Sequence, residues 1–305
     1  MNTEIKKSAA FLAVTFIIGW ILLAAVIKFH PKLHNAEILL IGFAYAFLPM
    51  IVAVIMQKAI YMEQIKEPLG ISFKLNWWYL VAWLFPVILA FAALAVSLFF
   101  PDVEFATGKT EFIDRLQFLF SESQINKMKQ QIEVLPLHPV FYALMHGMTV
   151  GITINALFAF GEEVAWRGFL FGKLLQKGFF KMSFIIGFFW GLWHIPMALQ
   201  GYNYSSNIIA GIFMTVFWYI LLSPIISYIR LKSGSILATA IFVGTLNSTY
   251  RMPLILLKGG SEFHIGLTGF AGFIILAITN LAIYVYENVP DDNEICESGS
   301  EPSAG

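Results

Sequence analysis

Charge is scarce in this chain of 305 residues: Asp, Glu, Lys and Arg together make up 12% of it, and the formal net charge is zero. Soluble domains carry roughly 25% charged residues, so the composition excludes an ordinary soluble protein. The lack of a basic excess argues against nucleic acid as a partner, because phosphate binding needs dense positive charge. The one cysteine, Cys296, can form no disulfide within the chain.

Hydrophobic residues make up 58% of the sequence and gather in long runs. A helix that crosses a bilayer needs about 20 mainly apolar residues, and this rule predicts a bundle of about eight transmembrane helices. The predicted spans are roughly 8–28, 36–58, 77–100, 140–162, 182–200, 208–229, 235–256 and 265–286. No run alternates with the period of two that the strands of a membrane barrel show. We therefore predict an all-α, polytopic membrane protein.

The connections divide the chain into four parts. We expect three helices and a long loop in 1–139, a core of four helices in 140–256, and a last helix in 257–286. From Trp166 to Lys181, Phe and Leu alternate with Lys, which predicts an amphipathic elbow helix after the fourth span. The acidic tail, 287–305, is rich in Ser, Gly and Pro and is predicted to be disordered.

Lys and Arg are unevenly divided between the two sides of the predicted bundle. Eleven of the 19 fall on the side that holds the N terminus. Since cytoplasmic connections carry an excess of Lys and Arg, we predict a multi-pass protein of the cell membrane with both termini in the cytoplasm. The lipid bilayer is the partner that this implies, while the sequence indicates no oligomeric state.

Two adjacent carboxylates, Glu162 and Glu163, follow the fourth apolar run. Charge at membrane depth costs at least ~2.5 kcal/mol and is by default a sign of function. On a helix Glu163 can pair with Arg167, four residues on, while Glu162 points about 100° away. A free Glu162 suits a general base. The alternative is that both acids cap the N terminus of the elbow helix.

Two further polar side chains lie in apolar runs. His194, one turn after Trp190, can hold a water or polarise a carbonyl group, although a lone histidine is often a satisfied core residue. Pro196 is expected to bend or end its helix. Asn247 can donate a hydrogen bond to an oxyanion or equally join two helices.

These residues resemble the motifs of the CAAX-prenyl-protease and bacteriocin-processing family of intramembrane proteases, which includes the type II CAAX peptidases. The first motif, Glu-Glu-x-x-x-Arg, is met at 162–167. The second, an aromatic residue four before a histidine, is met by Trp190 and His194. The third is a histidine followed four residues later by Asn or a small residue. Asn247 meets it, but Val243 stands at the histidine position. The resemblance covers about 140–250.

The resemblance implies an intramembrane glutamate endopeptidase. In it Glu162 activates the water, Glu163 and Arg167 support Glu162, and His194 and Asn247 position the water and stabilise the intermediate. Its substrate would be a peptide or protein, prenylated or membrane-anchored.

Trp190 and Val243 are expected beside the substrate. No cofactor is expected. A metal is not excluded, although this part of the chain offers only His194 and the two glutamates as ligands.

Val243 keeps a second function open. Losing one oxyanion donor costs about 10² to 10³ in rate, so the chain can instead be a pseudoprotease that binds peptides in the membrane, for instance as an immunity protein. A transporter is a third alternative, because intramembrane acids carry ions or protons. It is disfavoured, since the acids cluster at one membrane face and no inverted repeat is found.

Overall fold

The fold is a bundle of helices with one small ribbon of strands. The computed structural model describes residues 3–29, 35–111, 113 and 121–288. Within them, β1 (Val103–Phe105) pairs antiparallel with β2 (Leu257–Gly259) at one end of the bundle, and the rest of the regular structure is helical. The all-α membrane class is thus confirmed. The tail predicted to be disordered lies, from residue 289 on, outside the described residues.

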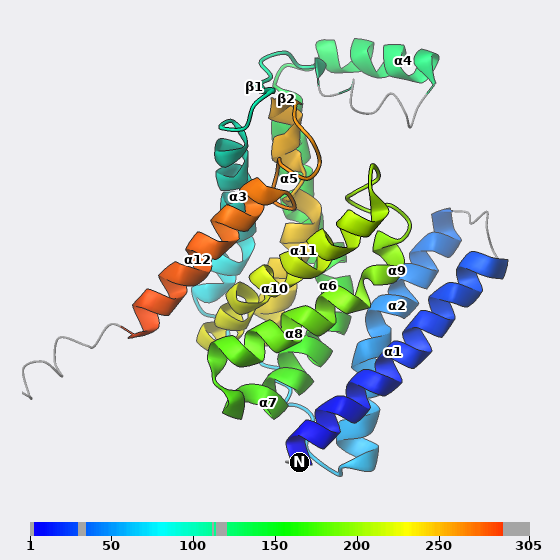
Figure 1. Ribbon diagram of the computed structural model, residues 1–305, viewed down its shortest axis with the longest axis vertical. Helices are drawn as coiled ribbons and strands as arrows, with labels where there is room; N and C mark the ends of the chain where they lie inside the picture. The colour runs from blue at the N-terminus through cyan, green and yellow to red at the C-terminus, as the bar shows by residue number, and fades with distance from the viewer. Residues whose placement is uncertain (1–2, 30–34, 112, 114–120, 289–305) are drawn as a thin grey trace, which may run out of the picture.

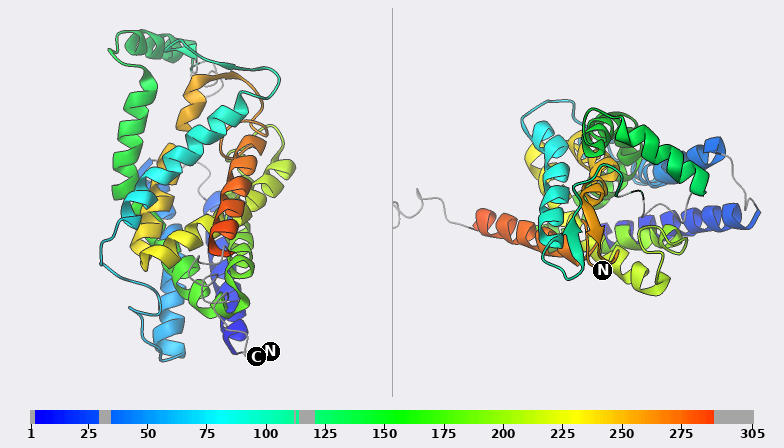
Figure 2. Two further views of the ribbon diagram at one scale, coloured as in Figure 1. Left: turned by 90° about the vertical axis from the view of Figure 1, so that its left-hand side faces the viewer. Right: turned by 90° about the horizontal axis from the view of Figure 1, so that it is seen from above.

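Helices make up most of the described chain (Figures 1 and 2). In order they are α1 (Thr3–Phe29), α2 (Asn35–Ile55), η1 (Met56–Ile60), α3 (Trp78–Ser97), α4 (Glu122–Glu133), α5 (Pro139–Val150), η3 (Gly151–Asn155), α6 (Ala156–Glu163), η4 (Val164–Leu170), α7 (Phe171–Leu174), η5 (Leu175–Lys177), α8 (Phe179–Trp193), α9 (Ile195–Ala198), α10 (Ile208–Ser233), α11 (Ile236–Thr249), η6 (Met252–Leu256) and α12 (Phe270–Asn288). The amphipathic α4 lies across the end of the bundle that carries the strands.

Six helical segments of the described chain are long and apolar enough to cross a membrane. They are Thr3–Val26, Leu40–Ile60, Trp78–Ser97, Pro139–Lys177, Ile208–Ser233 and Phe270–Glu287. Each overlaps one of the predicted spans.

The two remaining predicted spans coincide with helices that are too short to meet this criterion. α8 has 15 residues and ends before His194 and Pro196, and α11 has 14 residues and ends before Pro253. Proline supplies no backbone N–H to a preceding turn. At 1.5 Å per residue each helix rises only about 22 Å, less than the roughly 30 Å of a bilayer core. Eight spans therefore stay a prediction.

The fourth span does not end at residue 162, where the sequence predicts its end. The chain remains helical from Pro139 to Lys177, and every residue of the π-helical turn η4 is buried. It reverses direction at Gly178, where φ is 85°. An interfacial helix needs an exposed polar face. The structure therefore differs from the predicted elbow helix in its first half, which belongs to the core.

The central α11 packs against α3, α5, α6, η3 and α10. Its approach to the long run depends on glycine, because a Cβ atom on Gly244 would lie 2.4 Å from the carbonyl oxygen of Gly151. A Cβ on Gly161 would likewise lie 2.6 Å from the carbonyl oxygen of Ala46 in α2. These two contacts hold α6 firmly between α2 and α11.

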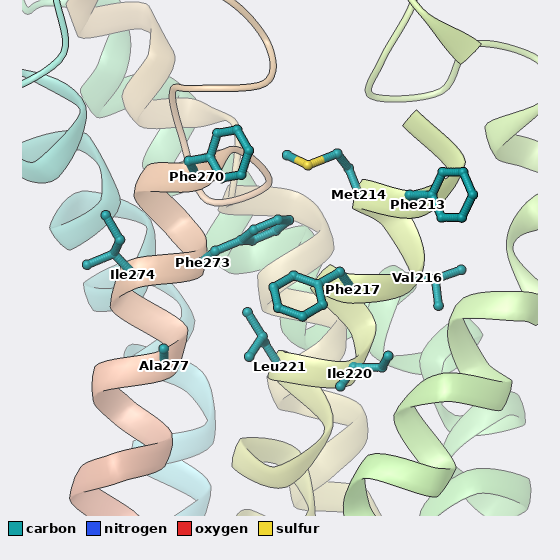
Figure 3. A pocket seen from close by; sticks show the side chains of 10 residues that line it. All are labelled: Phe213, Met214, Val216, Phe217, Ile220, Leu221, Phe270, Phe273, Ile274 and Ala277. Atoms are coloured by element: carbon teal, nitrogen blue, oxygen red, sulfur yellow. The ribbon is translucent and has the colours of Figure 1, made fainter. Parts of the chain in front are cut away.

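A lateral groove of about 680 Å³ lies between α10 and α12 (Figure 3). Its ten lining side chains are all apolar, with Phe213, Phe217, Phe270 and Phe273 the largest. Hydrocarbon chains are the neighbours that such a surface meets in a bilayer. We therefore assign the groove to the lipid-facing surface of the bundle. None of its lining residues is charged.

Replacing Gly244 with alanine tests the contact between α11 and η3. The added Cβ collides with backbone, so we expect the free energy of unfolding to fall by about 1 to 3 kcal/mol. Gly42→Ala in α2 is the matched control, because no atom lies within 4 Å of its added Cβ, and alanine favours a helix by roughly 0.5 to 1 kcal/mol. Thermal unfolding in detergent measures both. Equal effects of the two substitutions would contradict the packing argument.

Candidate active site

The two adjacent glutamates lie in the middle of the long helical run. Glu162 and Glu163 end α6, which is flanked by the π-helical turns η3 and η4. Such turns widen the helix locally and are frequent at functional sites. Glu163 is fully buried, whereas the side chain of Glu162 is 14% exposed. Helix α6 thus presents Glu163 to the core and leaves Glu162 partly accessible to solvent.

Glu163 forms the ion pair that the i, i+4 spacing predicts. Its Oε1 accepts a hydrogen bond of 2.8 Å from Nη1 of Arg167, and both side chains are 0% exposed. Nη2 of Arg167 donates to the hydroxyl of Ser223 at 3.3 Å, and the guanidinium lies 4.2 Å from the ring centre of Trp190. Breaking a buried pair leaves one charge uncompensated, at a cost of about 3 to 5 kcal/mol.

Glu162 is held by the second motif. Nε1 of Trp190 donates a hydrogen bond of 2.7 Å to its Oε2, and Nε2 of His194 lies 3.9 Å from its Oε1. The His194 side chain is 15% exposed. The structure therefore brings Glu162, Trp190 and His194 together. Trp190 is only 2% exposed, and its indole N–H is used on the carboxylate of Glu162.

The ring of His194 has a fixed orientation. Its Nδ1 lies 2.9 Å from the backbone carbonyl oxygen of Trp190, which can only accept, so we assign the proton of the neutral ring to Nδ1. The opposite nitrogen, Nε2, then carries a lone pair and faces Glu162. The ring also stacks on Tyr219 of α10, with centres 4.4 Å apart.

The third motif adds no hydrogen bond to this cluster in the described part of the chain. Val243 is 4% exposed and belongs to the apolar core. Asn247 is exposed, and among the described residues no hydrogen bond joins its side chain to Glu162 or His194. The hydrogen bond between helices in this region comes instead from Asn155, which donates to the hydroxyl of Ser248 at 2.7 Å.

Burial differs between the two ends of the site. Toward the end of the bundle that carries the N terminus, η4 is buried and Gly168 packs so closely on Leu69 that a Cβ would lie 2.9 Å from its carbonyl oxygen. Toward the other end, Tyr202 is 50% exposed. Its hydroxyl lies 3.5 Å from that of Tyr250, which donates to Asn203 at 2.8 Å. The site is thus covered on the side of the N terminus.

The described residues contain no group of three His, Cys, Asp or Glu side chains that could hold a metal ion. Of the three side chains that the sequence offers as ligands, Glu163 is engaged by Arg167. Glu162 and His194 remain as a pair with water-accessible atoms.

Sequence comparison finds a known family that resembles the part of the chain that holds this site. Residues 145–249 match the model of the type II CAAX prenyl endopeptidase Rce1-like family. Among curated proteins, the chain is similar to CAAX prenyl protease 2 of Methanococcus maripaludis, with 37% identity over 59 residues, which is 19% of this chain and 20% of that protein. The match spans about a fifth of the length of this relative. The resemblance indicated by the three motifs is confirmed for the matched segment.

The loop between α9 and α10, which carries Tyr202, is held by hydrogen bonds to Glu262. We expect acid to weaken these bonds. Glu262 accepts hydrogen bonds from the backbone and hydroxyl of Ser206, at 2.8 and 2.7 Å, and from the hydroxyl of Ser205. Partial burial alone would raise the pKa of Glu262, but these bonds outweigh it and hold the pKa below the ordinary 4.5. A lowered pKa gives stability that is complete above pH 4.5 and is lost as pH falls through the folded-state value.

We therefore expect limited proteolysis within 199–207 to accelerate below about pH 4.5. In Glu262→Gln, which lacks the titrating group, cleavage should be faster at neutral pH and should change little with acid. An acid response of the same size in Glu262→Gln would show that another group controls the loop.

Proposed function

We propose that this chain, whose residues 145–249 match the Rce1-like family, is an intramembrane endopeptidase in which Glu162 activates water. The observation that carries this proposal is the geometry of its carboxylate. It is partly exposed in an apolar bundle, held by Trp190 through one oxygen, and close to His194 at the other.

Glu162 and His194 together suit a hydrolytic water. The free oxygen of Glu162 and the lone pair on Nε2 of His194 can each accept one of its two hydrogens. As the water oxygen attacks the peptide carbonyl carbon, Glu162 takes a proton. It then passes this proton to the amine as the C–N bond breaks. The products are a carboxylate segment and an amine segment, and Glu162 returns to its starting form.

The buried pair supports this step without touching the water. Arg167 compensates the charge of Glu163, so Glu162 does not face an unpaired negative neighbour. The same guanidinium packs on the ring of Trp190, whose indole N–H orients Glu162. Glu163, Arg167 and Trp190 are therefore positioning residues, while Glu162 and His194 are the catalytic ones.

The proposed substrates are peptides or proteins that reach the site from the bilayer. The name of the relative, CAAX prenyl protease 2, supports prenylated or otherwise membrane-anchored substrates. Asn247 and Val243 are proposed to border the substrate, and no cofactor is proposed.

The excess of Lys and Arg on the side of the N terminus supports cytoplasmic termini. Since the site is covered on that side by η4 and Leu69, access is proposed from the bilayer or from the opposite end.

Glu162→Gln tests the proposed base. The amide can still accept from Trp190 but cannot take a proton, so cleavage should fall by about 10² to 10⁴. The assay uses purified protein in detergent with two matched libraries of quenched peptides, one carrying a farnesylated cysteine. Glu122→Gln on the exposed face of α4 is the matched control and should keep full activity. Undiminished turnover by Glu162→Gln would refute the glutamate mechanism.

Val243 supports one alternative, a peptide-binding pseudoprotease. If the chain is an enzyme, the native protein cleaves at least one library peptide, and Val243→His raises the rate by up to about 10² to 10³ through a restored donor. If it is a pseudoprotease, cleavage appears only after this substitution. Val243→Leu adds bulk without a donor and is the control. Equal rates for the histidine and leucine variants would show that position 243 contributes no polar group.

A further inference from the structure

Four tyrosines of the described chain have buried rings, and one of them differs in its hydroxyl group. Tyr45 donates to the carbonyl oxygen of Trp193 at 2.7 Å, Tyr204 to that of Thr268 at 2.6 Å, and Tyr250 to Asn203. The hydroxyl of Tyr219 has no hydrogen-bond partner among the described residues, although the residue is only 9% exposed. Since buried tyrosine hydroxyls usually find a partner, this group is available to a ligand.

The ring of Tyr219 is fixed beside the proposed catalytic residues. It stacks on His194 at 4.4 Å with an interplanar angle of 23°, and its centre lies 4.4 Å from that of Trp190. Helices α8 and α10 approach closely here, because a Cβ on Gly187 would lie 2.6 Å from the carbonyl oxygen of Tyr219. Tyr219 is therefore held by backbone contact as well as by its two aromatic neighbours.

The rest of the cluster is short of hydrogen-bond donors. Glu162 is an acceptor, the indole N–H of Trp190 is used on Glu162, and the ring proton of His194 is used on a carbonyl oxygen. Val243 contributes no polar atom. Peptide hydrolysis, however, develops a negative charge on the carbonyl oxygen, which needs a donor already in place.

We propose that the Tyr219 hydroxyl donates a hydrogen bond to the carbonyl oxygen of the scissile peptide as that oxygen becomes negative. This inference rests on the proposed endopeptidase function. The new C–O bond forms as the C=O π bond opens and its electron pair moves to the oxygen, which the Tyr219 O–H stabilises while keeping its proton. The π bond re-forms as the amine leaves with the proton that Glu162 took from water. Tyr219 is thus a catalytic residue that no motif identifies.

Tyr219→Phe keeps the stacked ring and removes only the hydroxyl. With a library peptide that the native protein cleaves, kcat should fall by about 10² to 10³, while KM changes less than about twofold, because the bond strengthens in the transition state. Tyr204→Phe is the matched control: it removes a hydroxyl that is bonded to Thr268 and not to the cluster, so it should lower the thermal stability and leave kcat unchanged. A kcat for Tyr219→Phe within about threefold of the native value would overturn the proposal.

Two further measurements separate a chemical role from a structural one. In a Glu162→Gln background, Tyr219→Phe should leave the Kd for the uncleaved peptide unchanged, whereas a binding role or a collapsed site would raise it. A ring-fluorinated tyrosine at 219 keeps the fold and the hydroxyl but donates more strongly, so kcat should change at constant KM. An unchanged kcat would overturn the proposal.

Failure of this inference can be told apart from failure of the endopeptidase function. If Glu162→Gln is inactive and Tyr219→Phe is fully active, only the role of Tyr219 is refuted. If Glu162→Gln retains full activity, the glutamate mechanism itself is refuted, and the assignment of Tyr219 fails with it.

Discussion

The buried ion pair between Glu163 and Arg167 is the constraint on which the site depends. Two opposite charges without solvent access persist in an apolar bundle only if each is compensated, and here the guanidinium meets Glu163, Ser223 and the ring of Trp190. This contact fixes Trp190, and Trp190 in turn holds Glu162. A charge that never reaches water thus determines the orientation of the carboxylate that does.

Backbone contact between helices makes this arrangement rigid. Gly161 allows α6 to touch α2, and Gly187 and Gly191 allow α8 to touch α10, since Cβ atoms at these positions would lie within 2.6 to 2.8 Å of backbone atoms or a Cβ of the neighbouring helix. Close approach through small residues is the usual way in which membrane helices pack. It brings the aromatic rings of α8 and α10 into contact, which side chains at these glycines would prevent.

The contacts within one helix were predictable from the sequence, and those between helices were not. The spacing of four residues predicts the pair of Glu163 with Arg167 because the helical period fixes that contact. The same logic relates Trp190 to His194. The buried state of η4 was missed, since the Lys pattern beyond it resembled an interfacial helix. Tyr219 was also missed, because a tyrosine in an apolar run gives no signal until the helix facing it is known. The unbonded hydroxyl becomes visible only in three dimensions.

Packing gives a reason why an apolar side chain suits position 243. α11 presses on η3 so tightly that Gly244 has no room for a Cβ, and Val243 beside it is buried in the core. An imidazole there would need both space and a hydrogen-bond partner, since an unpaired polar group in such a place is costly. Valine avoids that cost but removes a polar group from this wall. Because α10 presents Tyr219 to His194 from another wall, the function of a donor does not require a polar residue on α11. In this bundle one helix, α11, can thus supply close packing while another, α10, supplies the hydrogen-bond donor of the site.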